Sequence, residues 1–262
     1  MKGKTGKVFF EKADFSLSAG SASPLLPDEI KGARVLSFKI PRGESAVFGP
    51  DRASPNGAAA RIFVLVGGKG QLRAAGRSHA LAERAIFAPD PAGDFSILAL
   101  EESLVLEIQW AVEEGESSFM EAFALRAPYI QQYSASPLYN ETTKSKKTRS
   151  RSLLLQRILP RICIGSVETE GPDRVGVHAH PRIEQLFYTF PENEMDLLVD
   201  GERHHIGGDI LLHIPVGSEH GAEVAPGKKL HYIWIDFVID DEGLRYLDEA
   251  HELHDGEAKA AP

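Results

Sequence analysis

One pattern of residues occurs twice in this chain, and this duplication is the feature that most constrains the fold. Residues 76–89 can be laid along residues 201–215 with one extra residue in the second copy. A short segment rich in aliphatic and aromatic residues precedes each copy and another follows it, as in β-strands separated by glycine and proline turns. A chain of 262 residues is long enough for two domains of ordinary size. We therefore expect two similar units built from β-strands.

The second half also contains side chains with the spacing of metal ligands. His178 and His180 are two residues apart. In a β-strand, side chains at that spacing share a face at a separation of about 6.6 Å. Two imidazoles that lean together from there can converge on one ion, with bonds of about 2.1 Å. Pro181 and Arg182 then interrupt the strand, and the returning chain can place Ile183 outward and Glu184 inward, so that Glu184 supplies a third ligand.

His220 is the expected fourth ligand. It follows an apolar segment, residues 208–214, and a turn with Pro215 and Gly217 that re-aims the chain. A single histidine or glutamate in a strand is more often a packing or surface residue. Three histidines and one glutamate at these spacings instead favour a metal site, and the set carries this inference rather than any one member.

These segments resemble the two sequence motifs of the cupin superfamily. The first motif, G-x5-H-x-H-x3,4-E-x6-G, is matched by residues 177–184, and the second, G-x5-P-x-G-x2-H-x3-N, by residues 208–220. The chain departs from the motifs at glycine and asparagine positions but at no ligand: Pro191 replaces a glycine, and Val224 stands in the place of the asparagine. We expect residues 191–194 to form an enlarged hairpin loop over the rim of the cavity.

The resemblance implies an all-β fold of two cupin-type β-barrels, of the double-stranded β-helix or jelly-roll kind, with short helices. We predict a degenerate N-terminal barrel over residues 1–115, a linker over residues 116–155, and a metal-binding C-terminal barrel over residues 156–262 that ends in a helix. The first half has no H-x-H pair and only His79, so it cannot assemble the same ligands. The basic run at residues 142–151 is typical of a solvated linker, with anion binding as the alternative.

Three further residues are candidates for catalysis. His213 lies on the strand that leads to His220, where it could act as an acid or base in the cavity or contact the other barrel. Arg182 could recognise a substrate carboxylate or form an ion pair at the rim. Tyr188 shares strand parity with Glu184, so it could line the pocket, whereas most residues of this kind belong to the core.

Composition limits the partners and the compartment. The chain has 29 Lys and Arg against 38 Asp and Glu, a net charge of -9, which disfavours nucleic acid and anionic membrane surfaces. It shows no segment like a signal peptide and no apolar run of transmembrane length, so we expect a cytoplasmic protein. The single Cys163 lies in an apolar run and is interpreted as a buried structural thiol. His204 and His205 are expected in a solvated turn, and a monomer and a homodimer fit the sequence equally.

The expected ligand set leaves the reaction open. Three neutral imidazoles and one carboxylate would hold one divalent transition metal, Fe, Mn, Ni or Zn, with open positions for a substrate. We predict a metal-dependent cupin enzyme that acts on a small oxygenated metabolite, sugar-derived or a keto acid, by non-redox isomerase or lyase chemistry. The alternatives are an Fe(II)-dependent cupin dioxygenase and a non-enzymatic cupin that binds a small ligand. The partner in each case is a small molecule, anionic or polyhydroxylated.

Overall fold

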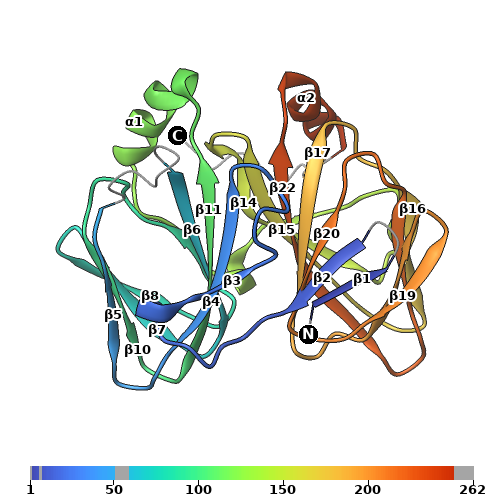
Figure 1. Cartoon of the computed structure of the whole chain (residues 1–262), viewed down its shortest axis with the longest axis horizontal. Coiled ribbons are helices and arrows are strands. Elements are labelled where there is room, and N and C mark those ends of the chain that lie inside the picture. The colour runs from blue at the N-terminus through green and yellow to red at the C-terminus, as the bar shows by residue number, and fades with distance from the viewer. Residues whose placement is uncertain (1, 6–7, 51–58, 251–262) are drawn as a thin grey trace. The chain divides into compact units, whose positions relative to one another are not determined.

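The computed structural model describes residues 2–5, 8–50 and 59–250 and consists of two compact units (Figure 1). Each unit is built from two antiparallel sheets, which confirms the predicted all-β fold of cupin-type barrels with short helices. The N-terminal barrel comprises Ala13–Ala135 and Ile158–Pro160, and the C-terminal barrel comprises Met1–Lys12, Ser136–Arg157 and Arg161–Pro262.

The N-terminal barrel has a six-stranded and a four-stranded sheet. The larger sheet has the order β12 (Tyr129–Gln131), β9 (Ile86–Ala88), β6 (Ala59–Gly67), β11 (Ser103–Ala111), β4 (Ala33–Ile40) and β3 (Ser23–Leu25). The smaller sheet has the order β5 (Ser45–Phe48), β10 (Phe95–Ala99), β7 (Gly70–Ala74) and β8 (Arg77–Leu81). The helical segments are η1 (Ala19–Ser21), η2 (Glu114–Glu116), α1 (Ser117–Ala124) and η3 (Tyr133–Ala135).

Aromatic side chains fill the interior of the N-terminal barrel. Phe63 stacks on Phe87 with ring centroids 4.9 Å apart, and Phe48 stacks on Phe95 at 4.8 Å. The guanidinium of Arg61 lies 5.2 to 5.5 Å from the centroids of three of these rings. A desolvated guanidinium over aromatic faces is stabilised by the ring quadrupoles. Aromatic packing therefore fills the centre of this barrel, and a small cavity that Arg61 and Phe95 line, with about 280 Å³ of empty space, has no histidine among its described lining residues.

The C-terminal barrel has an eight-stranded and a four-stranded sheet and ends in helix α2 (Asp241–Ala250). The larger sheet has the order β1 (Lys2–Thr5), β2 (Val8–Lys12), β20 (Ile210–Ile214), β17 (Ile183–Thr189), β22 (Lys229–Val238), β15 (Ile162–Glu170), β14 (Arg149–Leu159) and β13 (Leu138–Tyr139). The smaller sheet has the order β16 (Asp173–His178), β21 (His220–Val224), β18 (Met195–Val199) and β19 (Glu202–Ile206).

The first strands of the chain belong to the C-terminal barrel. β2 pairs antiparallel with β20, so that Phe9 lies opposite His213, and β1 pairs with β2 (Figure 1). β13 and β14 extend the same sheet at its other edge. The predicted boundaries at 1–115, 116–155 and 156–262 differ from these units, because pairing between strands far apart in the sequence leaves no mark in local composition.

The basic run at residues 142–151 is not a simple solvated linker. The Lys144 side chain is only 7% exposed, and its Nζ lies 2.5 Å from Glu141 Oε1. The Ser145 hydroxyl donates a hydrogen bond to the Asp173 carboxylate at 2.9 Å and so ties the run to β16. The prediction that this run is solvated is wrong for Lys144. The composition of a segment indicates the average exposure of its residues, but it does not reveal that one of them is buried.

Each barrel has a hairpin turn of the same kind at the start of the duplicated pattern. Ala75 and Gly76 join β7 to β8, and Asp200 and Gly201 join β18 to β19. All four residues have positive φ, 49° and 72° in the first turn and 48° and 84° in the second. Positive φ at both central residues defines the type I′ turn, whose twist matches that of the flanking strands. The repeat seen in the sequence therefore corresponds to a repeat in the backbone.

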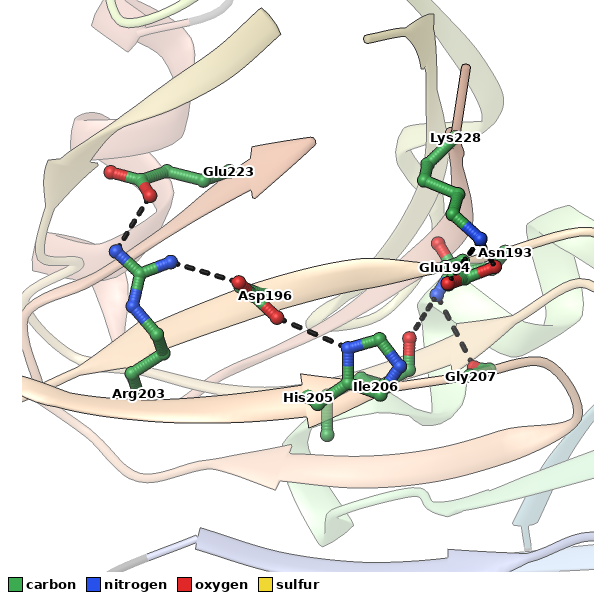
Figure 2. Close-up of polar contacts among 9 residues, drawn as sticks. All are labelled: Asn193, Glu194, Asp196, Arg203, His205, Ile206, Gly207, Glu223 and Lys228. Atoms are coloured by element: carbon green, nitrogen blue, oxygen red, sulfur yellow. Dashed lines mark hydrogen bonds and ion pairs between the residues drawn. The ribbon is translucent and has the colours of Figure 1, made fainter. Parts of the chain in front are cut away.

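An ion-pair network crosses the four-stranded sheet of the C-terminal barrel (Figure 2). Arg203 on β19 bridges Asp196 on β18, at 2.9 Å, and Glu223 on β21, at 2.6 Å. His205 Nδ1 lies 3.1 Å from the other carboxylate oxygen of Asp196. The predicted turn at His204 and His205 is wrong, since both residues lie within strand β19.

The predicted loop at residues 191–194 is anchored by a buried side chain. The Asn193 amide nitrogen donates to the carbonyl oxygens of Ile206, at 2.9 Å, and Gly207, at 3.2 Å (Figure 2). Its oxygen accepts a hydrogen bond from the His231 backbone at 2.9 Å. These bonds fix the loop to β19 and β22.

The helix predicted at the end of the chain is present as α2, and residues 251–262 lie outside the described part. Within the described residues, no helix combines the length and the apolar character that crossing a bilayer requires.

Candidate metal centre

Three of the predicted ligands come together in the C-terminal barrel. His178 is the last residue of β16, His180 follows it, and His220 opens β21, where it pairs with His178. Candidate ligand nitrogens of the three side chains all lie within 4.8 Å of one another. Because two nitrogens on one ion at bonds of about 2.1 Å can be at most about 4.2 Å apart, small side-chain rotations suffice to bring all three onto one metal.

A strand irregularity places the first histidine. The pairing of β16 with β21 shifts register between Val175 and His178. Such an irregularity bends a strand and redirects the side chain that follows it. Gly221 lies in β21 beside this point, where an added Cβ would approach the Val175 carbonyl oxygen to 2.8 Å. The close approach of the two backbones therefore favours glycine next to His220.

Backbone carbonyls select the tautomer of two of the rings. His178 Nδ1 lies 2.8 Å from the Gly176 carbonyl oxygen, and His220 Nδ1 lies 3.1 Å from that of Ser218. A carbonyl oxygen only accepts, so each Nδ1 carries the proton and each neutral ring presents the Nε2 lone pair. This is the usual arrangement of a metal-ligating histidine. The donor set therefore fits a divalent transition metal.

Burial keeps one of the three histidines neutral. The His220 side chain is buried, and this burial, with a smaller contribution from nearby His178, lowers its pKa to about 4. A ring that is neutral at physiological pH has its lone pair available to a metal. His180 is covered by helix α2, whose Tyr246 ring lies 5.5 Å from its ring in an edge-on arrangement.

Glu184 lies apart from the three histidines. Its Oε2 is 2.8 Å from His213 Nε2 and accepts a hydrogen bond from the Val216 backbone at 3.3 Å. We expected Ile183 to point outward and Glu184 inward, but Ile183 belongs to the barrel core. The parity is reversed because Arg182 adopts a left-handed conformation, with φ of 63°, just before β17. The role of Glu184 as fourth ligand stays a prediction.

Each of the three candidate catalytic residues has a polar contact with a residue outside the described lining of the cavity beside the histidines. His213 is buried and bonded to Glu184. The Arg182 guanidinium is exposed and forms an ion pair with Asp240, its Nε 2.7 Å from the carboxylate. The Tyr188 hydroxyl donates to Asp209 at 2.9 Å. None of the three is among the described residues that line the cavity beside the histidines. Their catalytic roles stay predictions.

The histidines open onto a cavity inside the barrel with about 460 Å³ of empty space, counting the part open to solvent. Its wall combines the three histidines with aromatic, aliphatic and charged side chains. The lining residues are Glu141, Lys144, Val175, His178, His180, Gln185, Phe187, Leu197, His220, Gly221, Ala222, Tyr232, Trp234 and Asp236.

Four polar residues of this wall were missed from the sequence. The Gln185 amide nitrogen donates to Asp236 Oδ1 at 2.7 Å, and Lys144 pairs with Glu141. Burial raises the pKa of Asp236 to about 7. Burial also lowers the pKa of Lys144, while Glu141 opposes that shift. One sequence signal was present, since Asp236 is the only acidic residue in the apolar segment at 230–237.

The single cysteine lies close to this cluster and is buried, as predicted. Cys163 pairs with Asp236 across β15 and β22. Burial, with a smaller contribution from Asp236, raises the pKa of its thiol well above the usual value. A thiol held protonated in this way is a poor nucleophile.

Comparison with known proteins identifies the fold. No family model and no curated protein matches the sequence. Solved structures do match. A putative glyoxylate-induced protein from Pseudomonas aeruginosa has a TM-score of 0.67 and 8% identity, over 91% of this chain and 85% of that one. A cupin 2 conserved barrel domain protein from Leptotrichia buccalis has a TM-score of 0.52 and 14% identity, over 91% and 92% of the two chains.

A third match is an enzyme. Oxalate decarboxylase from Bacillus subtilis, which has Mn(II) centres, gives a TM-score of 0.59 and 14% identity, over 87% of this chain and 78% of that one. Identities this low establish a shared architecture and leave the activity open. The chain is a two-barrel protein with the cupin fold, and its C-terminal barrel holds a histidine group that could bind a metal.

Proposed function

We propose that this protein is a metal-dependent enzyme that acts on a small oxygenated metabolite, sugar-derived or a keto acid, by isomerase or lyase chemistry without net redox change. The observation that carries the proposal is the group of His178, His180 and His220 at the wall of an internal cavity. The proposed ion is a divalent transition metal, Fe, Mn, Ni or Zn. When bound, it would polarise a substrate carbonyl and stabilise negative charge on the adjacent oxygen.

The chain supplies the rest of the chemistry from the cavity wall. Phe187, Tyr232 and Trp234 line the cavity with aromatic surface, which excludes water from a bound substrate. Asp236 has a pKa of about 7, so it can accept or give a proton near neutral pH. This acid and base capacity in a metal cavity supports isomerisation or a lyase reaction. The fold shared with oxalate decarboxylase, a lyase, is consistent with this class.

Metal content tests the proposal directly. Protein purified without an affinity tag is analysed by elemental mass spectrometry, beside a His178→Ala, His220→Ala double variant. The matched control is a His204→Ala, His205→Ala double variant, which also loses two histidines but outside the cavity. We expect near-stoichiometric metal in the wild type and the control and at least a tenfold loss in the first variant.

Turnover assays separate the reaction classes. Sugar-derived and keto acids are incubated with the metal-loaded protein with and without oxygen, and products are identified by mass spectrometry. Isomerised or cleaved products formed equally without oxygen support the proposal. Products that require oxygen would identify a dioxygenase instead. Protein that takes up no metal after reconstitution would overturn the proposal.

Glu184 can be tested separately. In this structure its carboxylate is bonded to His213. If Glu184 only holds His213, Glu184→Gln should change the metal dissociation constant less than threefold, whereas the predicted role as fourth ligand requires a larger loss of affinity. The measurement is a competitive titration with a chromophoric chelator. A loss of affinity of tenfold or more would show that the carboxylate turns toward the histidines and serves as the fourth ligand.

A further inference from the structure

The cavity next to the histidines has a second polar group that the metal does not use. His178 and His220 belong to the four-stranded sheet, whereas Gln185 and Asp236 are paired neighbours on β17 and β22 of the eight-stranded sheet. All four line the same cavity. A ligand held by a metal at the histidines would therefore meet Gln185 and Asp236 with the part that extends beyond the metal.

Gln185 has an unused acceptor. The residue is 4% exposed, and its Nε2 donates a hydrogen bond to Asp236 Oδ1. Its Oε1 is buried and accepts no hydrogen bond from the residues that the structure describes. A buried amide oxygen without a donor costs free energy, and such groups in native proteins are normally satisfied by water or by a ligand. This part of the cavity wall can therefore accept a hydrogen bond from a donor on a ligand.

The charges nearby argue against a second anionic group on the ligand. Lys144 is the one cation among the described residues of the lining, and Glu141 already lies 2.5 Å from it. Asp236 adds another carboxyl group, and no further cation faces it from the described lining. A ligand carboxylate placed here would meet two acidic groups and one ammonium that is already paired. Buried like charges of this kind are strongly unfavourable.

We propose that this cavity selects a metal-chelating ligand whose far end carries uncharged hydroxyl groups that donate to Gln185 and Asp236, and that it excludes dicarboxylates. The inference deepens the proposed function and rests on it, because the chelating end needs the histidine-bound metal. It narrows the substrate class from anionic or polyhydroxylated compounds to hydroxylated monocarboxylates.

Three matched probes test this selection. D-glycerate, lactate and tartronate share an α-hydroxycarboxylate that can chelate a metal and differ at the third carbon, which is a CH₂OH, a methyl or a carboxylate group. Dissociation constants are measured by calorimetry on the metal-loaded protein, with metal content determined on the same sample. We expect glycerate to bind about tenfold more tightly than lactate, since a hydrogen bond to a buried acceptor separates them. Tartronate should bind more weakly than glycerate.

Variants assign the selection to the two residues. Gln185→Met removes the acceptor at similar volume, so it should abolish the preference for glycerate over lactate while leaving lactate binding within about twofold. The control is Gln109→Met in the N-terminal barrel, where the same kind of amide donates to Glu107 at 2.8 Å. Asp236→Asn removes charge and keeps shape, so it should raise the affinity for tartronate relative to glycerate.

The outcomes separate the two proposals. Equal affinities for the three probes, tightest binding of tartronate, or no binding of glycerate by metal-loaded protein would overturn this inference and leave the metal centre standing. A preference for glycerate that persists in Gln185→Met would also overturn it. Protein that holds no metal after reconstitution would overturn the proposed function, and the inference with it.

Discussion

The larger sheets of the two barrels share the order of four central strands, but the barrel interiors differ. β9, β6, β11 and β4 of the N-terminal barrel correspond in order to β20, β17, β22 and β15 of the C-terminal barrel. On β6 and β11, Arg61 pairs with Glu107 at 2.8 Å. On β17 and β22, a polar contact joins Gln185 to Asp236, the residue opposite it in the register. The first pair is a full ion pair, whereas the second leaves an amide oxygen open beside a cavity.

This difference shows how little a barrel must change to gain or lose a site. The backbone pattern and the type I′ hairpin are kept in both units. Phenylalanine rings occupy the interior of the first barrel, and histidines with polar groups surround a cavity in the second. Fold and function are thus specified by different residues of the same strands.

The largest effect is expected from a substitution in the packed interior of the N-terminal barrel. Phe63 contacts Phe87 and Phe95 in the N-terminal barrel, and its side chain is fully buried. Phe63→Ala should lower the free energy of unfolding of that barrel by about 3 to 5 kcal/mol, because it removes packed apolar surface and leaves a void. Metal content of the other barrel should not change.

The two tryptophans allow the barrels to be followed separately. Trp110 lies in β11 and Trp234 in β22, and both are buried. Denaturant titrations in a Trp234→Phe background report the N-terminal barrel, and those in a Trp110→Phe background report the C-terminal barrel. If Phe63→Ala lowered the free energy of unfolding of both barrels by a similar amount, the view that each interior is stabilised by its own packing would be contradicted.

A second effect concerns the protonation of Asp236 in the cavity of the C-terminal barrel. Asp236 has a pKa of about 7 in the folded protein against 3.8 for the unperturbed group, so between these values the folded state holds a proton that the unfolded chain has lost. The contribution of Asp236 to the free energy of unfolding is therefore greatest below about pH 4. It falls as the pH rises toward 7 and does not change further at higher pH. The loss has an upper bound of roughly 4 kcal/mol, at 1.36 kcal/mol per pKa unit.

The measurement is the free energy of unfolding from pH 4 to 8 on metal-free protein in the Trp110→Phe background. Asp236→Asn should flatten the decline relative to the parent. Lys144 and Glu141 also act on Asp236, and Gln185 and Cys163 lie opposite it in the sheet, so the comparison uses Asp236→Asn, which leaves all four residues in place. Parallel curves for the two proteins would show that Asp236 keeps an ordinary pKa.

The smallest effect is expected at the surface. Arg203 joins Asp196 and Glu223 across three strands, but its side chain is 51% exposed. Exposed ion pairs contribute little after solvent screening, so Arg203→Gln should cost no more than about 1 kcal/mol and should cost less at high salt. Thermal unfolding at two salt concentrations checks this. A larger loss that is independent of salt would indicate that the aliphatic part of Arg203 packs against the sheet.

The sequence was sufficient for the fold and for part of the site. The repeated pattern led to two similar β units, and the spacing led to His178, His180 and His220, since side-chain alternation and turn chemistry are local properties. That the units are barrels was implied by the resemblance to the cupin motifs. The parity of Glu184 depends on the conformation of one residue, Arg182, and no pattern in the sequence reveals it. Burial of Lys144 depends on the strands that surround it, which are distant along the chain.

The path of the chain has a consequence for how the protein can be made and divided. Strands β1 and β2 precede the N-terminal barrel in the chain, yet β2 pairs with β20, which is synthesised about 200 residues later. During translation the β1–β2 hairpin must therefore remain without its partner strand β20 while the N-terminal barrel is produced. No single cut of the polypeptide can release both barrels intact, because a fragment that starts after residue 12 leaves β20 as an open edge. Circular permutation that moves the first hairpin to the other end of the chain would remove this dependence.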